Sequence, residues 1–283
     1  MSRTTPVTPY SIRTRIGRDA SSGFYAVPHR YRLHLSLSCP DCLRIAITHA
    51  LLRLDDILPL TLLPEHPDDD GRAALQQMYE ATRHGSGRPA TVPALSDSWT
   101  GRIVSNHAPD ILRDLATWFR GPGAVELHPA HAESESGILT RMLDEEITAA
   151  VQPACRGERV EGERLETLFA ALDDLEARLA VRPYLLGESL TAADVHLWVT
   201  LLELDTVHRP HLDASAVRRI AARRRLWEYA RRLCDQPAFH RHLRAEEIAR
   251  RHGRRCRGAE PAGGEGQFDE GQFIDWTPSR AAV

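Results

Sequence analysis

The sequence predicts two domains of different class, an α/β domain followed by an all-α domain. Polar and apolar residues alternate from Arg30 to Ser38, which is the pattern of a β-strand with one buried face. The apolar residues that come next recur at helical spacing, so a helix follows the strand. From Ile138 to His252 the apolar patterns are helical throughout. A chain of 283 residues is long enough to bury two such cores.

The α/β domain is expected over residues 30–122, after an extended arm of residues 1–29 that is rich in Ser, Thr, Pro and Gly. Leu33, Leu35 and Leu37 share one face of its first strand. Apolar runs and turn residues predict the other elements: helices over 43–54, 72–82 and 109–119, and strands over 57–63, 88–95 and 101–106. With Pro93 at the opening of the third strand, this order is that of a thioredoxin-like fold.

The all-α domain is expected over residues 123–252, beyond the turn sequence at residues 121–123. Its helices are predicted over 138–151, 159–180, 191–205, 214–235 and 237–252. Thr191 and Asp194 form a capping box at the start of the third of these helices. Residues 253–283 are rich in Gly and Glu, so we expect a flexible C-terminal tail unless its few aromatic residues dock.

The composition excludes several classes of protein. The formal net charge is −3, from 36 basic and 39 acidic residues, so there is no general positive field to attract a nucleic acid. No apolar run is long enough to cross a bilayer and the N-terminus has no signal segment, so we expect a cytoplasmic chain without membrane or nucleic-acid partners. All the basic residues are arginine, which is typical of a GC-rich genome and excludes lysine Schiff-base chemistry.

The motif with the most chemical content is Cys39-Pro40-Asp41-Cys42, at the junction of the first strand and helix. A helix N-terminus favours the thiolate, so Cys39 is the expected nucleophile, and Cys42, one turn on, can resolve a mixed disulfide. Asp41 should oppose thiolate formation. The alternatives are a zinc half-site and two packed free thiols. Zinc needs two more ligands, and the same domain offers no second Cys or His pair, so we favour redox chemistry and expect no metal.

The other cysteines, three of the five, carry no motif, and an odd count without an export signal argues against a disulfide framework. They are Cys155, Cys234 and Cys256.

Other positions in the α/β domain can hold a thiol ligand. A proline placed like Pro93 is often cis, which leaves the Val92 main chain free to pair with a peptide-like thiol, whereas the alternative is an ordinary proline at the start of a strand. Ser105 and Asn106 precede a helix, where they either hold a carboxylate or simply cap the helix. The arginine runs of the all-α domain are expected to be solvated helix faces, with an anionic ligand as the alternative.

Taken together, these segments resemble the glutathione transferase superfamily, and more narrowly the omega-like, Xi-class family of glutathionyl-hydroquinone reductases. The resemblance covers about residues 24–252 and rests on residues 30–40, Arg88 with 91–93, 103–106, 168–176 and 184–195. It implies the glutathione transferase fold, a homodimer, and a cysteine that takes the glutathionyl group from a hydroquinone as a mixed disulfide, which a second glutathione releases. It also implies that Cys39 is this nucleophile, that Arg88 and the Val92 main chain hold the thiol cofactor, and that Pro93 is cis.

The sequence departs from this family at three places. Asp41-Cys42 stands where the family has Trp-Ala, which suggests a dithiol mechanism. In the family, a Glu-Ser pair follows the Ser-Asn of the cofactor-binding segment and binds the γ-glutamyl group of glutathione. Here His107-Ala108 follows Ser105-Asn106 in its place. We therefore expect the cofactor to be glutathione or another low-molecular-weight thiol such as mycothiol. The tyrosines that hold the quinol oxygen have no counterpart at Gln152 or at residues 251–253.

We therefore expect a thiol-dependent transferase or reductase that acts on a quinone-like or disulfide substrate through Cys39. Two alternatives stay open. One is a mycothiol-dependent or pathway-specific transferase of secondary metabolism, and the other is a non-enzymatic binding or stress protein that has lost thiol recognition.

Overall fold

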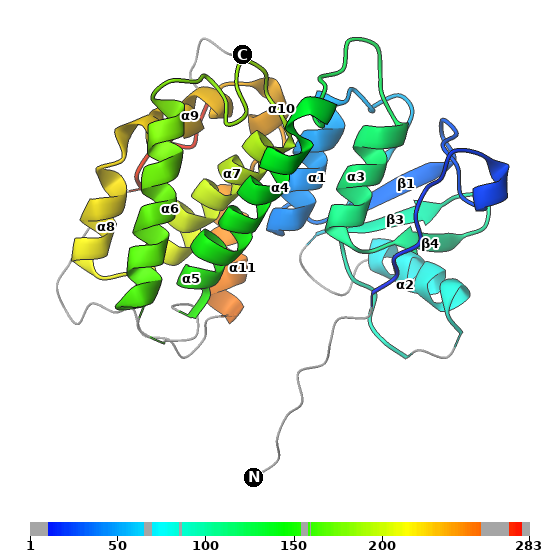
Figure 1. Ribbon diagram of the computed structural model, residues 1–283. Coiled ribbons are helices and arrows are strands. Elements are labelled where there is room, and N and C mark those ends of the chain that lie inside the picture. The colour runs from blue at the N-terminus through cyan, green and yellow to red at the C-terminus, as the bar shows by residue number, and fades with distance from the viewer. Residues whose placement is uncertain are drawn as a thin grey trace. The chain divides into compact units, whose positions relative to one another are not determined.

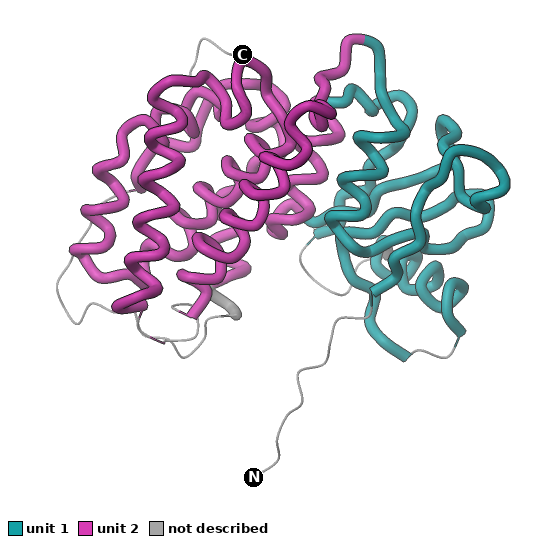
Figure 2. Tube along the Cα trace, viewed as in Figure 1, with its two compact units in different colours: residues 1–36, 52–122 teal, residues 37–51, 123–283 magenta. Residues whose placement is uncertain are grey.

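The computed structural model describes residues 11–64, 70–84, 87–153, 158, 160–255 and 272–278. The chain divides into two compact units (Figure 2). The first unit comprises Met1–Ser36 and Leu52–Pro122, and the second comprises Leu37–Leu51 and Gly123–Val283. Cys155 and Cys256 lie outside the described residues.

The first unit is built on a mixed sheet whose strand order, among the described residues, is β2-β1-β3-β4. Figure 1 shows β1, β3 and β4 side by side. The strands are β1 (Tyr31–Leu35), β2 (Leu60–Leu62), β3 (Ala94–Asp97) and β4 (Arg102–Ser105). β1 is parallel to β2 and antiparallel to β3, and β3 is antiparallel to β4. The helices α2 (Asp70–Thr82) and α3 (Ala108–Trp118) and the short 3-10 turn Ala20–Ser22 complete this unit. The predicted thioredoxin-like class is confirmed.

The described part of the N-terminal arm is packed against this unit. Ile12 is only 3% exposed. Arg13 Nε donates to Asp110 Oδ2 at 2.8 Å, and Arg15 Nε donates to Asp114 Oδ1 at 2.8 Å, so two ion pairs hold the arm along α3. One buried cluster joins the arm to α2 and the sheet; it consists of Ile12, Leu63, Leu75, Tyr79, Ala94 and Ile103.

Among the described residues, the regular elements of the second unit are all helices, and one isolated β-bridge joins Tyr184 and Gly187. The α-helices are α1 (Pro40–Leu51), α4 (Glu133–Arg141), α5 (Ala149–Val151), α6 (Glu163–Leu179), α7 (Ala192–Glu203), α8 (Ala214–Ala221), α9 (Arg224–Cys234), α10 (Pro237–His240) and α11 (Ala245–Arg255). Two stretches have the wider π-helical turn, Met142–Thr148 and Leu204–His208, and short 3-10 turns span Ala130–Ala132 and Arg209–His211. None of the described helices is long and apolar enough to cross a bilayer.

Helix α1 groups with the second unit, whereas its sequence position suggested the α/β domain. The reason is its packing against α7 and α10. The helices also differ in extent from those predicted. The expected helix over 138–151 contains a π-helical stretch, and those over 214–235 and 237–252 each divide in two. Apolar spacing does not distinguish these turns from a continuous α-helix.

The capping box predicted at the start of α7 is present. Thr191 donates from both its backbone N and its Oγ1 to Asp194 Oδ2, each at 2.8 Å. The buried Asp194 also accepts a hydrogen bond of 2.7 Å from the Tyr229 hydroxyl of α9. The cap therefore ties the start of α7 to a neighbouring helix as well as satisfying its own N–H groups.

The C-terminal tail is expected to be flexible unless its few aromatic residues dock, and in the part that the structure describes one of them, Trp276, does dock. Helix α11 continues to Arg255, and residues 272–278 pack on the helical unit. Trp276 is 4% exposed, its ring lies edge-on to Trp198 at 5.4 Å, and its Nε1 donates to Asp205 Oδ2 at 2.8 Å. Burial of this one large aromatic side chain outweighs the Gly- and Glu-rich composition of the segment.

Candidate functional site

Cys39 occupies the N-cap position of α1. Its carbonyl accepts the first hydrogen bond of the helix, from Leu43 N at 2.9 Å, and Pro40 is the first helical residue. Cys39 is partly exposed whereas Cys42 is fully buried, and both are free cysteines. Hydrogen bonds to the Cys39 sulfur, first from the Cys42 thiol and to a smaller extent from the Cys42 backbone N–H, lower the pKa of Cys39 to about 6. Burial and the negative charge of Asp41 oppose this shift. The expected effects of the helix N-terminus and of Asp41 are both present.

Arg251 of α11 also stabilises the thiolate of Cys39. Its positive charge lowers the pKa of Cys39, and its Nη1 donates to Ser38 Oγ at 3.3 Å. The sequence singled out residues 251–253 only as a place where the family's tyrosines are missing. The pairing of α11 with the turn before α1 spans more than two hundred residues, and no local pattern predicts it.

Three pairs of titratable groups belong to the helices of the second unit that neighbour this turn. Arg44 lies 3.6 Å from Asp41 within α1, and His196 Nε2 of α7 lies 3.0 Å from Asp144 Oδ1. The third pair is Glu203 Oε1 at the end of α7 and His252 Nε2 of α11, 3.9 Å apart. No local sequence pattern singles out Arg44, His196 or Glu203.

Burial shifts the pKa values of two of these groups, His196 and Glu203, toward their neutral forms. Burial, and then Arg44, lowers the pKa of His196. Burial and the negative charges of Asp41 and Cys39 raise the pKa of Glu203 to about 8, although Arg44 opposes the shift. At pH 7 the site therefore combines a thiolate at Cys39 with a protonated carboxyl group at Glu203.

In the first unit, the Val92–Pro93 peptide bond is cis, as predicted. Pro93 is buried and Val92 is half-buried beside β3. Thr91 accepts a hydrogen bond of 2.9 Å from Tyr79 OH at its carbonyl, which fixes this segment to α2. Arg88 is exposed, and its carbonyl accepts a hydrogen bond of 3.1 Å from Gln76 Nε2.

The side chains of Ser105, Asn106 and His107 make hydrogen bonds or ion pairs within the first unit. Ser105 is fully buried, and its Oγ accepts from His107 N at 3.1 Å. Asn106 Oδ1 accepts from Ile12 N at 2.7 Å, and His107 Nδ1 lies 3.1 Å from Asp110 Oδ2. The prediction that Ser105 and Asn106 cap α3 is wrong. The N-cap is His107, its side chain makes no capping bond, and Asn106 Oδ1 accepts from Ile12 N of the arm.

The predicted site residues are divided between the two units. Cys39 and Cys42 belong to the second unit, and the six predicted cofactor residues, from Arg88 to His107, belong to the first. Among the described residues, no group of three or more His, Cys, Asp or Glu side chains is arranged to hold a metal ion. Cys234 is buried, its Sγ donates to the Trp276 carbonyl at 3.1 Å, and burial raises its pKa to about 11. It is therefore an inert thiol.

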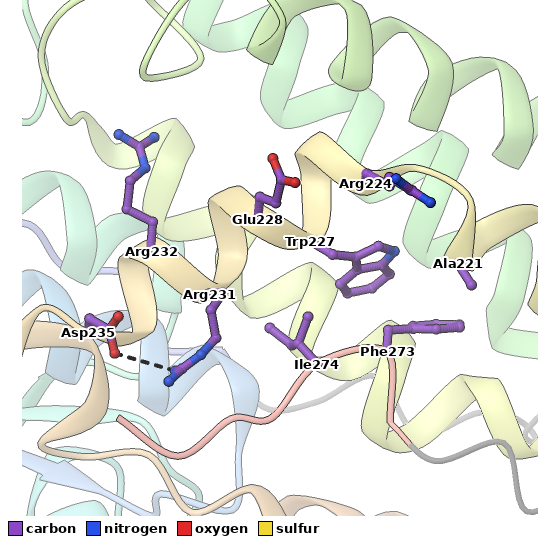
Figure 3. A pocket seen from close by; sticks show the side chains of 9 residues that line it. All are labelled: Ala221, Arg224, Trp227, Glu228, Arg231, Arg232, Asp235, Phe273 and Ile274. Carbon is purple, nitrogen blue, oxygen red and sulfur yellow. Dashed lines mark ion pairs between the residues drawn. The ribbon is translucent and has the colours of Figure 1, made fainter. Parts of the chain in front are cut away.

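A pocket of about 580 Å³ lies between α9 and residues 272–278 of the second unit (Figure 3). The Trp227 and Phe273 rings, 4.6 Å apart, form its apolar wall. Arg231 pairs with Asp235 at 3.4 Å. The lining residues are Ala221, Arg224, Trp227, Glu228, Arg231, Arg232, Asp235, Phe273 and Ile274, and none of them is a predicted site residue.

Comparison with known proteins identifies the family of the chain. Residues 145–232 match the family model of the glutathione S-transferase C-terminal domain. The glutathionyl-hydroquinone reductase PcpF of Sphingobium chlorophenolicum is 30% identical over 227 residues, which cover 73% of this chain and 72% of that protein.

Two solved structures are similar along most of their length. A glutathione transferase from Gordonia bronchialis is 29% identical with a TM-score of 0.73, covering 86% of this chain and 82% of that one. The glutathione-bound structure of YqjG, a glutathione transferase homologue from Escherichia coli K-12, is 27% identical with a TM-score of 0.68, covering 82% of each chain. The chain therefore belongs to the glutathionyl-hydroquinone reductase family of the glutathione transferase superfamily and is a thiol transferase or oxidoreductase of that kind.

Proposed function

We propose that this enzyme removes a thiol-derived group from a quinone-like or disulfide substrate, with Cys39 as its nucleophile. The observation that carries the proposal is the position of Cys39 at the N-cap of α1, where hydrogen bonds from Cys42 lower its pKa to about 6. A sulfur with this pKa is mostly thiolate at neutral pH, and the thiolate is the reactive form. The relative PcpF is a glutathionyl-hydroquinone reductase, which supports the quinone-like class of substrate.

In the first step, the Cys39 thiolate attacks the sulfur that joins the thiol to the substrate. A sulfur–sulfur bond forms, the sulfur–carbon bond breaks, and its electron pair and a proton go to the released hydroquinone. For a disulfide substrate, the sulfur–sulfur bond of the substrate breaks, and the leaving group departs with its electron pair as a thiolate. The product on the enzyme is a mixed disulfide between Cys39 and the thiol cofactor.

The mixed disulfide is then resolved by a thiol. Either a second cofactor molecule attacks it and leaves as the cofactor disulfide, or the Cys42 thiol attacks Cys39 and releases the cofactor. The second route leaves a Cys39–Cys42 disulfide, which two further cofactor thiols reduce. The direct contact between Cys42 and the Cys39 sulfur supports the second route.

The thiol cofactor is glutathione or a related low-molecular-weight thiol such as mycothiol. The glutathione-bound relative YqjG supports glutathione. His107-Ala108, in place of a Glu-Ser pair, supports a thiol without a γ-glutamyl group. We assign Arg88, the Val92 main chain and Pro93 to cofactor binding, with Ser105, Asn106 and His107 forming the adjoining turn. The homodimer expected from the resemblance remains a prediction.

The test is to trap the mixed disulfide. The Cys42→Ser variant should accumulate one adduct when it is mixed with a glutathionyl-hydroquinone or with the disulfide of glutathione or mycothiol. Intact-protein mass spectrometry measures the adduct, and its mass names the thiol. Cys234→Ser is the matched control and should behave as wild type, because Cys234 is buried with a raised pKa. Adducts that persist in Cys39→Ser would contradict the proposal.

A further inference from the structure

Glu203 is placed where the regular course of α7 ends. It is the last residue of α7, and the next five residues, Leu204–His208, form a π-helical turn. π-helical turns are rare in proteins, and those that occur often lie at functional sites. The preceding residues of α7 are almost all buried and mostly apolar, and the side chain of Glu203 is 18% exposed. Burying an ionised carboxylate in this position costs folding free energy. Glu203 takes no part in the capping box at the other end of α7.

Helix α11 connects Glu203 with the turn that carries Cys39. Two consecutive residues of α11 make these contacts. Arg251 Nη1 donates to Ser38 Oγ, next to Cys39, at 3.3 Å, and His252 Nε2 lies 3.9 Å from Glu203 Oε1. Helix α11 packs against Leu204–His208, and α1 packs against α7. All of these segments belong to the second unit, so the geometry is that of one compact body.

The charged groups around Glu203 come from two elements. Cys39, Asp41 and Arg44 act on it from α1 and the residue before it, and His252 approaches it from α11. Burial is the largest influence, and with the two negative charges it raises the pKa of Glu203 to about 8. Two titratable groups with pKa values moved in opposite directions, a low one for the nucleophile and a high one for a carboxyl group, are the arrangement expected of a nucleophile and an acid.

We propose that Glu203 is the general acid that protonates the leaving group when the Cys39 thiolate attacks. This role rests on the proposed function. In the step, the new sulfur–sulfur bond takes the electron pair of the thiolate. The bond from sulfur to the leaving carbon or sulfur breaks, and that atom takes the proton of the Glu203 carboxyl group. The negative charge thereby moves from Cys39 to Glu203, so the net charge of the site is unchanged.

The electrostatic coupling between Cys39 and Glu203 makes the proton transfer coincide with the attack of the thiolate. The thiolate of Cys39 contributes to the raised pKa of Glu203. Once Cys39 is a neutral disulfide this contribution is gone, so the carboxyl group releases its proton more readily as the bond to Cys39 forms. When a thiol resolves the disulfide, the thiolate of Cys39 is restored and Glu203 regains a proton from water.

The test compares two substrates with leaving groups of different basicity. Glu203→Gln keeps the size of the side chain but has no acidic proton. It should lower kcat for a glutathionyl-hydroquinone at pH 7 by about 100-fold, a typical general-acid contribution. With an aromatic disulfide that releases a weakly basic thiolate, no proton is needed, and the same variant should react at the wild-type rate. Glu203→Asp, which keeps an acid, should recover part of the lost rate.

The controls separate this role from folding and from the proposed function. Glu228→Gln, at an exposed position of α9, should match wild type with both substrates. An equal loss with both substrates in Glu203→Gln, or no loss with either, would overturn the assignment of Glu203 while leaving Cys39 as the nucleophile. A wild-type protein that reacts with neither substrate would instead overturn the proposed function and this step with it.

Discussion

The Cys39 sulfur accepts hydrogen bonds from both the thiol and the backbone N–H of Cys42. The backbone contact is the one that an N-cap residue makes with the third residue of a helix, here formed by a sulfur in place of an oxygen. The thiol contact is possible only because a second cysteine stands at this position. The residue that is available to resolve a disulfide therefore also stabilises the thiolate before the reaction.

Removing the thiol of Cys42 should raise the pKa of Cys39. In Cys42→Ala the first and largest cause of the lowered pKa is lost, and we expect an upward shift of about one unit, which corresponds to one charge-assisted hydrogen bond. Cys42→Ser keeps an O–H donor and should shift much less. The measurement is the rate of Cys39 alkylation by iodoacetamide as a function of pH. Identical curves for the two variants would show that the thiol is not a donor to Cys39.

Replacing Arg251 by Gln should also raise the pKa of Cys39, by less than the loss of the Cys42 thiol and in a salt-dependent way. The positive charge favours the thiolate, and salt screens charge–charge interactions. The alkylation curve at low and high ionic strength measures both effects. Arg250→Gln is the matched control, since Arg250 is exposed and bonds to the Glu246 carbonyl of its own helix. An equal shift of the Cys39 pKa in both variants would mean that the net charge of the protein, and not the position of Arg251, lowers this pKa.

The rate of the transfer step should depend on pH as a bell. The rate rises as pH passes about 6, because Cys39 loses its proton and becomes nucleophilic, and falls as pH passes about 8, because Glu203 loses the proton that it donates. Steady-state kcat/KM with a glutathionyl-hydroquinone gives the curve. The falling side should be absent in Glu203→Gln. A falling side that persists in that variant would place the second titration elsewhere.

The docked segment around Trp276 should contribute to the stability of the helical unit. Trp276→Ala loses a buried ring, its contact with Trp198 and its bond to Asp205, and should lower the free energy of unfolding by ~3 kcal/mol. Trp99 is 62% exposed, so Trp99→Ala should change the free energy of unfolding by less than ~0.5 kcal/mol. Urea unfolding followed by circular dichroism measures both. Equal midpoints for the two variants would mean that the segment does not stabilise the fold.

The features that the sequence predicts correctly are those with local signals. Alternation at Leu33 and Leu35 predicts β1, and the three-residue spacing of Thr191 and Asp194 predicts the start of α7. The nucleophile motif is local too, since the cap, the cysteine and the helix lie within a few residues. These patterns depend on backbone geometry over one or two turns, which neighbouring residues determine.

The features that the sequence does not predict depend on contacts between distant segments. Arg251 reaches the turn before α1, and the pKa of Glu203 is raised first by its burial and then by the negative charges of Asp41 and Cys39. Their residue types are ordinary for a helix surface, so only the packing of α11 and α1 reveals them. The sequence allows for docking of the aromatic residues of the tail, but it does not predict that Trp276 contacts Trp198 and Asp205. The contact by which Asn106 holds the arm at Ile12 likewise joins segments far apart in the sequence.

The central claim is that Cys39 is a thiolate nucleophile at neutral pH. The most direct measurement is iodoacetamide alkylation of the wild-type protein across pH, with peptide mass spectrometry following the peptide that contains Cys39. We predict a half-maximal rate near pH 6, as the lowered pKa requires. A half-maximal rate near the ordinary cysteine value of about 8.5 would contradict the account.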